Sequence, residues 1–599
     1  MYNGNMKERE ECRLRLYWKY IRMILPYFIF SVMCMCVESG VELIQPTLMA
    51  DILDVGVANG DMVYVLRTSA VMLLAVLFYA GAAFGRNVLS TRGSQWFAYY
   101  MRADLYKKIQ SLTPDELNRF GAGTLMTRVT NDITQLQNMT MGLMRVCIKA
   151  PILCIGGIIM AWRLNATLAL IPIIATAVIF VMIAVNIKYG FPLFSRVQSA
   201  LDSVNTVIRE YLSGIRVVKA FNRFGFEVNR FNVPNEDLKR KSVFASRVMA
   251  IFNPAVTFVI YVGIVILYWE GGIYVNEGIM HTGQIIAFVS YMTQILHALN
   301  MFSNIFQRIV RSKASAQRLT EIVNAESLRV PVNAPKLDET QGIVFENVGF
   351  SYKNATGRPA LRNVSFTCGV GERVGVIGAT GAGKTTLISL VLQFYEPTEG
   401  TVRIFGADVT QSDPKEVRRH LAVVPQRVML FTGTIRENLR WGRENATDAE
   451  LEEAARVACA DTFIRSFKEG YDTMLGHSGV NLSGGQRQRV AIARALIKNP
   501  RILILDDCLS AVDALTEASI RNYLRDVSEN CGCLIVSQKI SSIRDCDKIL
   551  VLDDGEGVGF GTHAELLKTC AVYRDIYLSQ YGRDALQNAA GGTEAVVHG

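Results

Sequence analysis

The sequence predicts a chain in two parts, a membrane domain of six transmembrane helices followed by an α/β domain. Half of the 599 residues are hydrophobic and only 20% are charged, which is less charge than a soluble chain usually carries. Six apolar segments in the first half reach the roughly 20 residues that a helix needs to cross a bilayer. Beyond about residue 325 no segment is that long, and short apolar strands alternate with amphipathic helices, as in α/β domains.

The six predicted spans form three pairs, each joined by a short loop. They lie near Ile24–Ala50, Val65–Val88, Gly142–Ala161, Ala166–Val185, Ala250–Trp269 and Gly283–Val310. The polar stretches between pairs, residues 89–138 and 187–246, carry many Lys and Arg residues, so the positive-inside rule places them in the cytoplasm. Both termini and the α/β domain are then cytoplasmic, and the protein is expected in the cell membrane as a partner of the lipid bilayer.

The net charge of +9 does not predict a nucleic-acid-binding protein, because Lys and Arg form no dense block. We expect no nucleic-acid partner. The 12 cysteines include no CxxC pair, so neither a metal ribbon nor a thioredoxin-like site is indicated.

A few polar residues interrupt the spans. Glu38 and Glu42 are four residues apart and therefore share one face of the first span. They could face a cavity and attract cationic substrates, or lie in contact with water near the end of the span. Lys149 and His297, in the third and sixth spans, are interpreted as structural residues.

A polar stretch with two prolines predicts a linker between the domains. The predicted boundaries are 1–323 for the membrane domain, 324–340 for the linker, 341–582 for the α/β domain and 583–599 for a flexible tail.

The stretch Gly378-Ala-Thr-Gly-Ala-Gly-Lys384-Thr385 fits the phosphate-binding pattern GxxxxGK[ST]. An apolar strand, Arg373–Ile377, precedes it and a helix follows. In this context glycines let backbone N–H groups face phosphate at a helix N-terminus. Lys384 is expected to reach the β- and γ-phosphates of ATP, and Thr385 to hold Mg²⁺. Asp506 ends a later apolar strand, where P-loop proteins place a second residue for Mg²⁺.

Between these motifs lies Leu482-Ser-Gly-Gly-Gln486, followed by Arg-Gln-Arg-Val-Ala-Ile-Ala-Arg494-Ala. This stretch resembles the signature of ATP-binding cassette (ABC) proteins. Together with the P-loop and six spans, it makes the chain similar to a half-size ABC exporter. The resemblance implies six transmembrane helices with long cytoplasmic extensions, followed by a P-loop ABC ATPase domain with a helical subdomain.

The resemblance also implies roles for individual residues. Tyr352 would stack on adenine, and Gln426 would sense Mg²⁺. Ser510–Asp513 matches the D-loop, and Ser111–Gly123 and Ser213–Arg223 match the coupling helices. The expected ATP contacts are Tyr352, Gly378, Thr380, Gly381, Gly383, Lys384, Thr385, Thr386, Ser483, Gly484, Gly485 and Gln486, with Thr385, Gln426 and Asp506 holding Mg²⁺.

Three positions depart from the family. In the family, the general base is a Glu directly after the Walker B aspartate, which is Asp506 in this sequence. The next residue here is Asp507, whose shorter side chain places the carboxylate about 1.5 Å short of the required position. The switch histidine is Gln538, which cannot carry a charge. His477 replaces a usual Glu, and we assign it no role. The predicted catalytic positions are therefore Asp507, Gln538 and Gln426, in a site that binds ATP but hydrolyses it poorly, unless Asp507 serves as a weak base.

In ABC dimers each ATP lies between the P-loop of one cassette and the signature of the other. The resemblance therefore implies a different half-transporter as partner, whose active site this chain's signature completes. The expected function is ATP-driven export of a small molecule, multidrug-like or lipid-like. Two alternatives stay open: an ATP-binding regulatory or gating subunit with little transport of its own, and an importer of metal chelates with exporter architecture.

Overall fold

The computed structural model describes residues 17–328, 331, 334–353, 357–508, 514–527 and 531–582. The chain separates into two compact units. The helical unit comprises Met1–Ser111 and Phe120–Ala325, and the α/β unit comprises Leu112–Arg119 and Glu326–Gly599. The predicted D-loop, Ser510–Asp513, lies outside the described residues.

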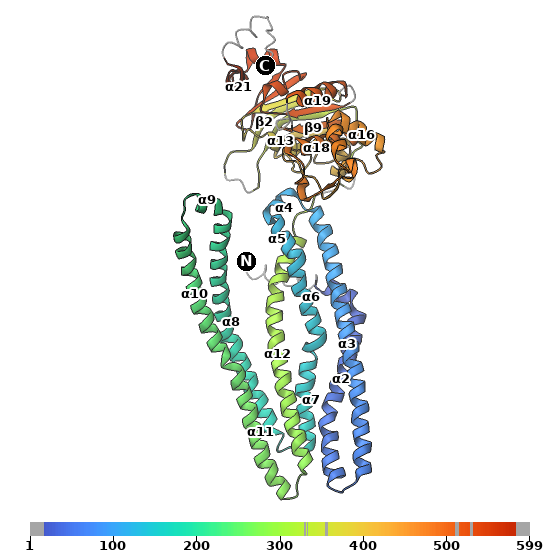
Figure 1. The fold of residues 1–599 in the computed structure, drawn as a ribbon, viewed down its shortest axis with the longest axis vertical. Helices are drawn as coiled ribbons and strands as arrows, with labels where there is room; N and C mark the ends of the chain where they lie inside the picture. The colour runs from blue at the N-terminus through green and yellow to red at the C-terminus, as the bar shows by residue number, and fades with distance from the viewer. Residues whose placement is uncertain are drawn as a thin grey trace. The chain divides into compact units, whose positions relative to one another are not determined.

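The helical unit consists of long helices connected by short turns. They are α2 (Leu25–Asp51), α3 (Met62–Ser111), α5 (Ala122–Thr127), α6 (Ile133–Gly142), α7 (Lys149–Leu164), α8 (Leu170–Ser213), α9 (Ile215–Ala220), α10 (Phe224–Ala250), α11 (Phe252–Asn276) and α12 (Thr282–Val323). Short π-helical segments, Ile52–Val57, Arg128–Asp132 and Leu143–Cys147, continue α2, α5 and α6. Within this unit α8 and α10 run side by side and are joined at one end by α9 (Figure 1).

Five helical stretches among the described residues are long and apolar enough to cross a membrane. They are Leu25–Val57, Met62–Ser111, Ala122–Leu164, Leu170–Ser213 and Phe224–Asn276. Each overlaps one of the first five predicted spans, although the first stretch begins at Leu25 instead of Ile24 and the fourth at Leu170 instead of Ala166. The sixth predicted span lies within α12, in which the side chains of residues 302–311 are outside the description. The helices extend beyond their apolar segments, as predicted: α3 continues for 50 residues, with no proline in its sequence.

The α/β unit is built on a ten-stranded sheet with the order β5-β4-β1-β2-β12-β11-β3-β10-β9-β6. The strands are β1 (Ile343–Phe350), β2 (Leu361–Cys368), β3 (Arg373–Gly378), β4 (Glu399–Ile404), β5 (Ala407–Asp408), β6 (Leu421–Val424), β9 (Ile502–Asp506), β10 (Gly532–Val536), β11 (Lys548–Asp553) and β12 (Glu556–Gly561). Strands β11, β3, β10, β9 and β6 are parallel neighbours. Their apolar runs are buried because helices cover such sheets on both faces.

Helices and a small two-stranded sheet complete the α/β unit. The helices are α4 (Pro114–Phe120), α13 (Lys384–Val391), α14 (Pro414–His420), α15 (Ile435–Arg440), α16 (Asp448–Val457), α17 (Asp461–Ser466), α18 (Gly484–Ile497), α19 (Ala514–Val527), α20 (His563–Thr569) and α21 (Ala571–Tyr581), and the small sheet pairs β7 (Gly433–Thr434) with β8 (Met474–Leu475). Helices α15 to α18 pack into one buried cluster with the sheet. The carboxyl ends of β3, β9 and β10 meet at one edge, where ligands of such sheets bind.

Candidate functional site

The loop between β3 and α13 is the predicted phosphate-binding loop, and its backbone requires glycine. Gly381 and Gly383 have φ values of +86° and +97°, which residues with a side chain rarely adopt. A Cβ atom on Gly383 would also lie 2.6 Å from Leu361 Cδ2. Lys384 is the first residue of α13 and Thr385 the second, so the free backbone N–H groups of this first turn point toward the loop. The loop therefore fits a phosphate group.

Lys384 is held inside the same loop. Its Nζ atom donates hydrogen bonds to the carbonyl oxygens of Gly378, at 2.7 Å, and Ala379, at 2.8 Å. Burial lowers the pKa of Lys384, while the charges of Asp507 and Asp506 act in the opposite direction. A phosphate would be a stronger partner for this ammonium group than two neutral carbonyls.

Strand β9 brings Asp506 and Asp507 to the same edge. Burial raises the pKa of Asp506, and the charge of Asp507 raises it further. Asp507 lies in the left-handed region, with φ of +45°, and its N–H donates to the carbonyl of Val536 at 2.9 Å. Gln426, which follows β6, donates from Nε2 to Asp507 Oδ2 at 3.2 Å. The structure thus brings Gln426, Asp506 and Asp507 together beside Lys384.

Gln538 follows β10, whose end lies next to β3 and β9 in the sheet. Ser537 N–H donates to the carbonyl of Val376 at 3.1 Å, which anchors this segment to β3. The Gln538 side chain is exposed, while the main-chain carbonyl oxygen of Gln538 accepts a hydrogen bond from Gln580 Nε2 at 2.7 Å. The side chain of His477 is not among those that the structure describes.

Tyr352 lies in an aromatic cluster beside the phosphate-binding loop. Its ring centroid is 4.8 Å from that of Phe350 and 5.3 Å from that of Tyr395. Its hydroxyl is hydrogen-bonded to the hydroxyl of the buried Thr386 in α13, at 3.0 Å. Tyr395 was not predicted as a site residue, because no motif marks it.

The signature residues form the N-terminus of α18. Ser483 is the N-cap: its Oγ accepts from Gln486 N–H, and Gln486 Oε1 accepts from Ser483 N–H at 2.9 Å. Ser483 and Gly484 are exposed, and a Cβ atom on Gly484 would meet nothing within 4 Å. A helix N-terminus attracts anions, and this one opens to free space.

The polar residues of the first and third spans form one buried ion network in the helical unit. Glu38 is 1% exposed, so contact with water is the wrong interpretation for this residue. Its carboxylate pairs with Arg86 Nε at 2.5 Å and with Lys149 Nζ at 2.7 Å. Lys149 also pairs with Glu42 at 2.9 Å. The sequence did not reveal Arg86 as a member, because it lies on α3, 48 residues away from Glu38.

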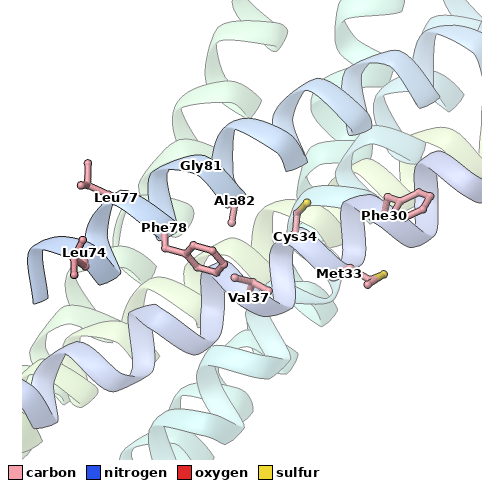
Figure 2. Close-up of a pocket in the computed structure, with 9 residues that line it drawn as sticks. All are labelled: Phe30, Met33, Cys34, Val37, Leu74, Leu77, Phe78, Gly81 and Ala82. Atoms are coloured by element: carbon pink, nitrogen blue, oxygen red, sulfur yellow. The ribbon is translucent and has the colours of Figure 1, made fainter. Parts of the chain in front are cut away.

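The remaining candidate in the membrane unit, His297, has an exposed side chain. A separate apolar hollow of about 660 Å³ lies between α2 and α3 (Figure 2). It is lined by Phe30, Met33, Cys34, Val37, Leu74, Leu77, Phe78, Gly81 and Ala82. This lining offers no charged side chain to a ligand.

Comparison with known proteins gives consistent results for both parts of the chain. A family model described as "ABC transporter transmembrane region" matches residues 28–299, and one described as "ABC transporter" matches residues 361–510. The uncharacterized ABC transporter ATP-binding protein YfiB of Bacillus subtilis is 37% identical over 574 residues, which is 95% of this chain and 100% of the relative. An uncharacterized ABC transporter ATP-binding protein of Mycobacterium tuberculosis is also 37% identical, over 95% of this chain and 98% of the relative.

The fold is similar to that of a solved bacterial Atm1-family ABC exporter with ATP bound. The TM-score is 0.80 at 24% sequence identity, and the match covers 94% of this chain and 99% of the other.

Proposed function

The chain belongs to the ABC transporter family, as a half-transporter with its membrane and ATPase domains in one chain, and we propose that it is the slowly hydrolysing half of a heterodimeric exporter. The substrate would be a small molecule, multidrug-like or lipid-like. The chain would lie in the cell membrane with both termini and residues 341–582, the ATPase domain, in the cytoplasm.

The observation that carries this proposal is Asp507, at the position where the family has its general base. An aspartate carboxylate lies about one carbon–carbon bond, ~1.5 Å, short of a glutamate carboxylate, and base catalysis depends on placement within hydrogen-bond reach of the attacking water. One of its oxygens also accepts a hydrogen bond from Gln426. Gln538 supplies no charge at the switch position. Both features favour slow hydrolysis at this P-loop.

The residues at the site fit Mg²⁺ bound together with ATP. Thr385, Gln426 and Asp506 would hold the ion through oxygen atoms, the ligands that Mg²⁺ prefers. Because the amide nitrogen of Gln426 faces Asp507, its amide oxygen is the atom left for the ion. The bound ion would neutralise charge on the phosphates. Lys384 would exchange its two carbonyl partners for phosphate oxygens.

The exposed N-terminus of α18 supports the second half of the proposal. One chain has one P-loop and one signature, so two chains are needed to enclose each ATP. Ser483 and Gly485 would complete the site of a partner that has Glu and His at the positions of Asp507 and Gln538. Closure of the two ATPase domains on ATP would then turn the membrane cavity outward, and hydrolysis at the partner's site would reset it.

Co-purification with a second half-transporter tests the proposal. A suitable partner is one encoded in a neighbouring reading frame, with Glu after its Walker B aspartate. We expect the pair to release phosphate at least 100-fold faster than this chain alone, since a positioned base contributes about 10²–10⁴ in rate. An equally fast ATPase from this chain alone would show the proposal to be wrong. ATP-dependent uptake of a fluorescent lipophilic dye by inside-out vesicles containing the pair would show export, and ATP binding without uptake would indicate a regulatory subunit instead.

A further inference from the structure

The segment that follows β10 carries Gln538 and is fixed at its start. Ser537 N–H donates to the carbonyl of Val376 in β3 at 3.1 Å, and the Ser537 hydroxyl accepts a hydrogen bond from Lys539 N–H at 3.0 Å. The Gln538 side chain is exposed, and within the described part of the chain it makes no hydrogen bond. Its placement therefore depends on the main chain that carries it.

The side-chain amide of Gln580, in helix α21, holds this main chain at two points. Its Nε2 atom donates to the main-chain carbonyl of Gln538 at 2.7 Å, and its Oε1 atom accepts from the N–H of Ile540 at 2.9 Å. Both distances are those of well-formed hydrogen bonds. Because one amide group supplies both the donor and the acceptor, the paired contact fixes the orientation of residues 538–540 as well as their position.

Helix α19 holds the far end of the same segment. Glu517, which is 7% exposed, accepts a hydrogen bond from Ser542 Oγ at 2.7 Å, and Arg521 donates to the carbonyl of Ser541. The main chain of Gln538 lies outside these contacts. Within the described residues, the α21 amide is its only side-chain partner, so the contact from α21 completes the support of this segment.

We propose that Gln580 is a positioning residue, which places the Gln538 side chain against the γ-phosphate of ATP. This rests on the proposed function, because it requires ATP at this P-loop with its γ-phosphate beside Gln538. A glutamine amide can donate a hydrogen bond to a phosphate oxygen, and ADP has no γ-phosphate. Gln580 itself does not touch the nucleotide; it acts through the main chain of Gln538. Its loss should therefore weaken the binding of ATP and leave the binding of ADP unchanged.

The ratio of the Kd for ADP to the Kd for ATP tests the proposal. Both constants are measured with Mg²⁺ on the purified full chain, for the wild type, Gln580→Ala, Gln538→Ala and the double variant. The net contribution of one neutral hydrogen bond corresponds to about 2- to 12-fold in affinity. We therefore expect each single change to weaken ATP binding by about 3- to 10-fold, with the Kd for ADP unchanged. The double variant should bind ATP no more weakly than Gln538→Ala, because both changes remove the same contact.

Two further variants separate positioning from folding stability. Gln580 is exposed and alanine is a strong helix former, so Gln580→Ala should fold. Gln580→Glu keeps an acceptor for Ile540 N–H but places a carboxylate against the Gln538 carbonyl, and it should lose the preference for ATP in the same way. Gln393 is a buried glutamine of the same domain whose Nε2 donates to Ser412 Oγ at 2.8 Å. Gln393→Ala should therefore lower the Tm and leave the ratio of the two Kd values unchanged.

Three results would overturn the proposal: an unchanged ratio in Gln580→Ala, additive losses of ATP affinity in the double variant, or an equal weakening of ATP and ADP binding. Lys384→Ala tests the proposed function separately. ATP binding that does not depend on Lys384 would refute that function, whereas Lys384-dependent binding that ignores Gln580 would refute this inference alone.

Discussion

Lengthening the residue after Asp506 by one methylene is expected to turn a slow ATPase into a faster one. Asp507→Glu extends the carboxylate by about 1.5 Å, toward the position of a general base. A well-placed base is worth about 10²–10⁴ in rate, or about 2.7–5.4 kcal/mol of activation free energy. Because Gln538 still lacks a charge, we expect the lower end for the single variant, about 10²-fold, and a further rise with Gln538→His.

The structure also indicates how much folding stability the Asp507→Glu substitution would lose. The hydrogen bond from Gln426 Nε2 to Asp507, at 3.2 Å, would be lost, at about 1 kcal/mol. The φ of +45° at this position suits Asp, which bonds locally, better than a longer side chain, and this difference costs about 1 kcal/mol. Both costs reduce the stability of the folded protein and leave the rate per folded molecule unaffected. The rise should therefore be visible in protein that remains folded.

The assay is phosphate release by the purified full chain at saturating ATP and Mg²⁺, with Lys384→Ala as the background. If two copies of the chain pair, each would offer an intact Ser483 to the other's P-loop, so this comparison is made without the second half-transporter. If Asp507→Glu bound ATP as the wild type does and released phosphate no faster, the length of the side chain would not be the limiting factor. If Asp507→Asn lowered the wild-type rate 100-fold, Asp507 would already be the base, and our reasoning would be wrong.

Three further predictions concern other parts of the chain. In the pair with a second half-transporter, Ser483→Arg should lower the ATPase rate at least 100-fold, because the arginine blocks the partner's phosphate site. Photolabelling of this chain by an azido-ATP should persist in the variant. An unchanged ATPase rate would mean that the signature of this chain completes no active site. Glu38→Gln should destabilise the protein by about 3 kcal/mol, because it removes the carboxylate that pairs with the buried Arg86 and leaves Lys149 with Glu42 alone. The Tm in detergent should fall more than for Glu210→Gln in an exposed pair, and equal shifts would contradict this. Burial lowers the pKa of His563 below its usual 6.5, so protonation favours the unfolded chain and the free energy of unfolding should fall as the pH drops below 6.5. His563→Gln should therefore flatten the dependence of Tm on pH between pH 7.5 and 5.5. An unchanged slope of Tm against pH would exclude this histidine as the source of the dependence.

The proposed ATP site could be predicted from the sequence because its motifs are local. The P-loop glycines, Lys384 and Thr385 are contiguous, and the strand before them fixes their place at the sheet edge. Asp506 and Asp507 follow a second buried strand in the same way. The sequence does not predict the backbone conformation of Asp507, which has a positive φ and donates its N–H to Val536 of β10. It also does not predict the hydrogen bond that Gln426, which follows β6, donates to Asp507.

Contacts between segments that are far apart in the sequence were not predictable, because no local pattern encodes them. Glu38 and Glu42 were recognised as a pair because helical spacing places them together, but their partners depend on how α2, α3 and α7 pack. Lys149 was interpreted alone, although it pairs with both glutamates. Tyr395 has no motif, and Tyr352, which its ring contacts, lies 43 residues before it. Only the three-dimensional packing makes this tyrosine a neighbour of Tyr352.

The length of α3 has a mechanical consequence. Its 50 residues form a rod of about 75 Å at 1.5 Å per residue, more than twice the roughly 30 Å of bilayer hydrocarbon. A tilt of about 5° at one end of such a rod displaces the other end by about 6 Å. Without an interior proline, α3 acts as a stiff lever arm. Bending is expected instead in α8 and α10, which contain Pro192 and Pro234, because helices bend most sharply at proline.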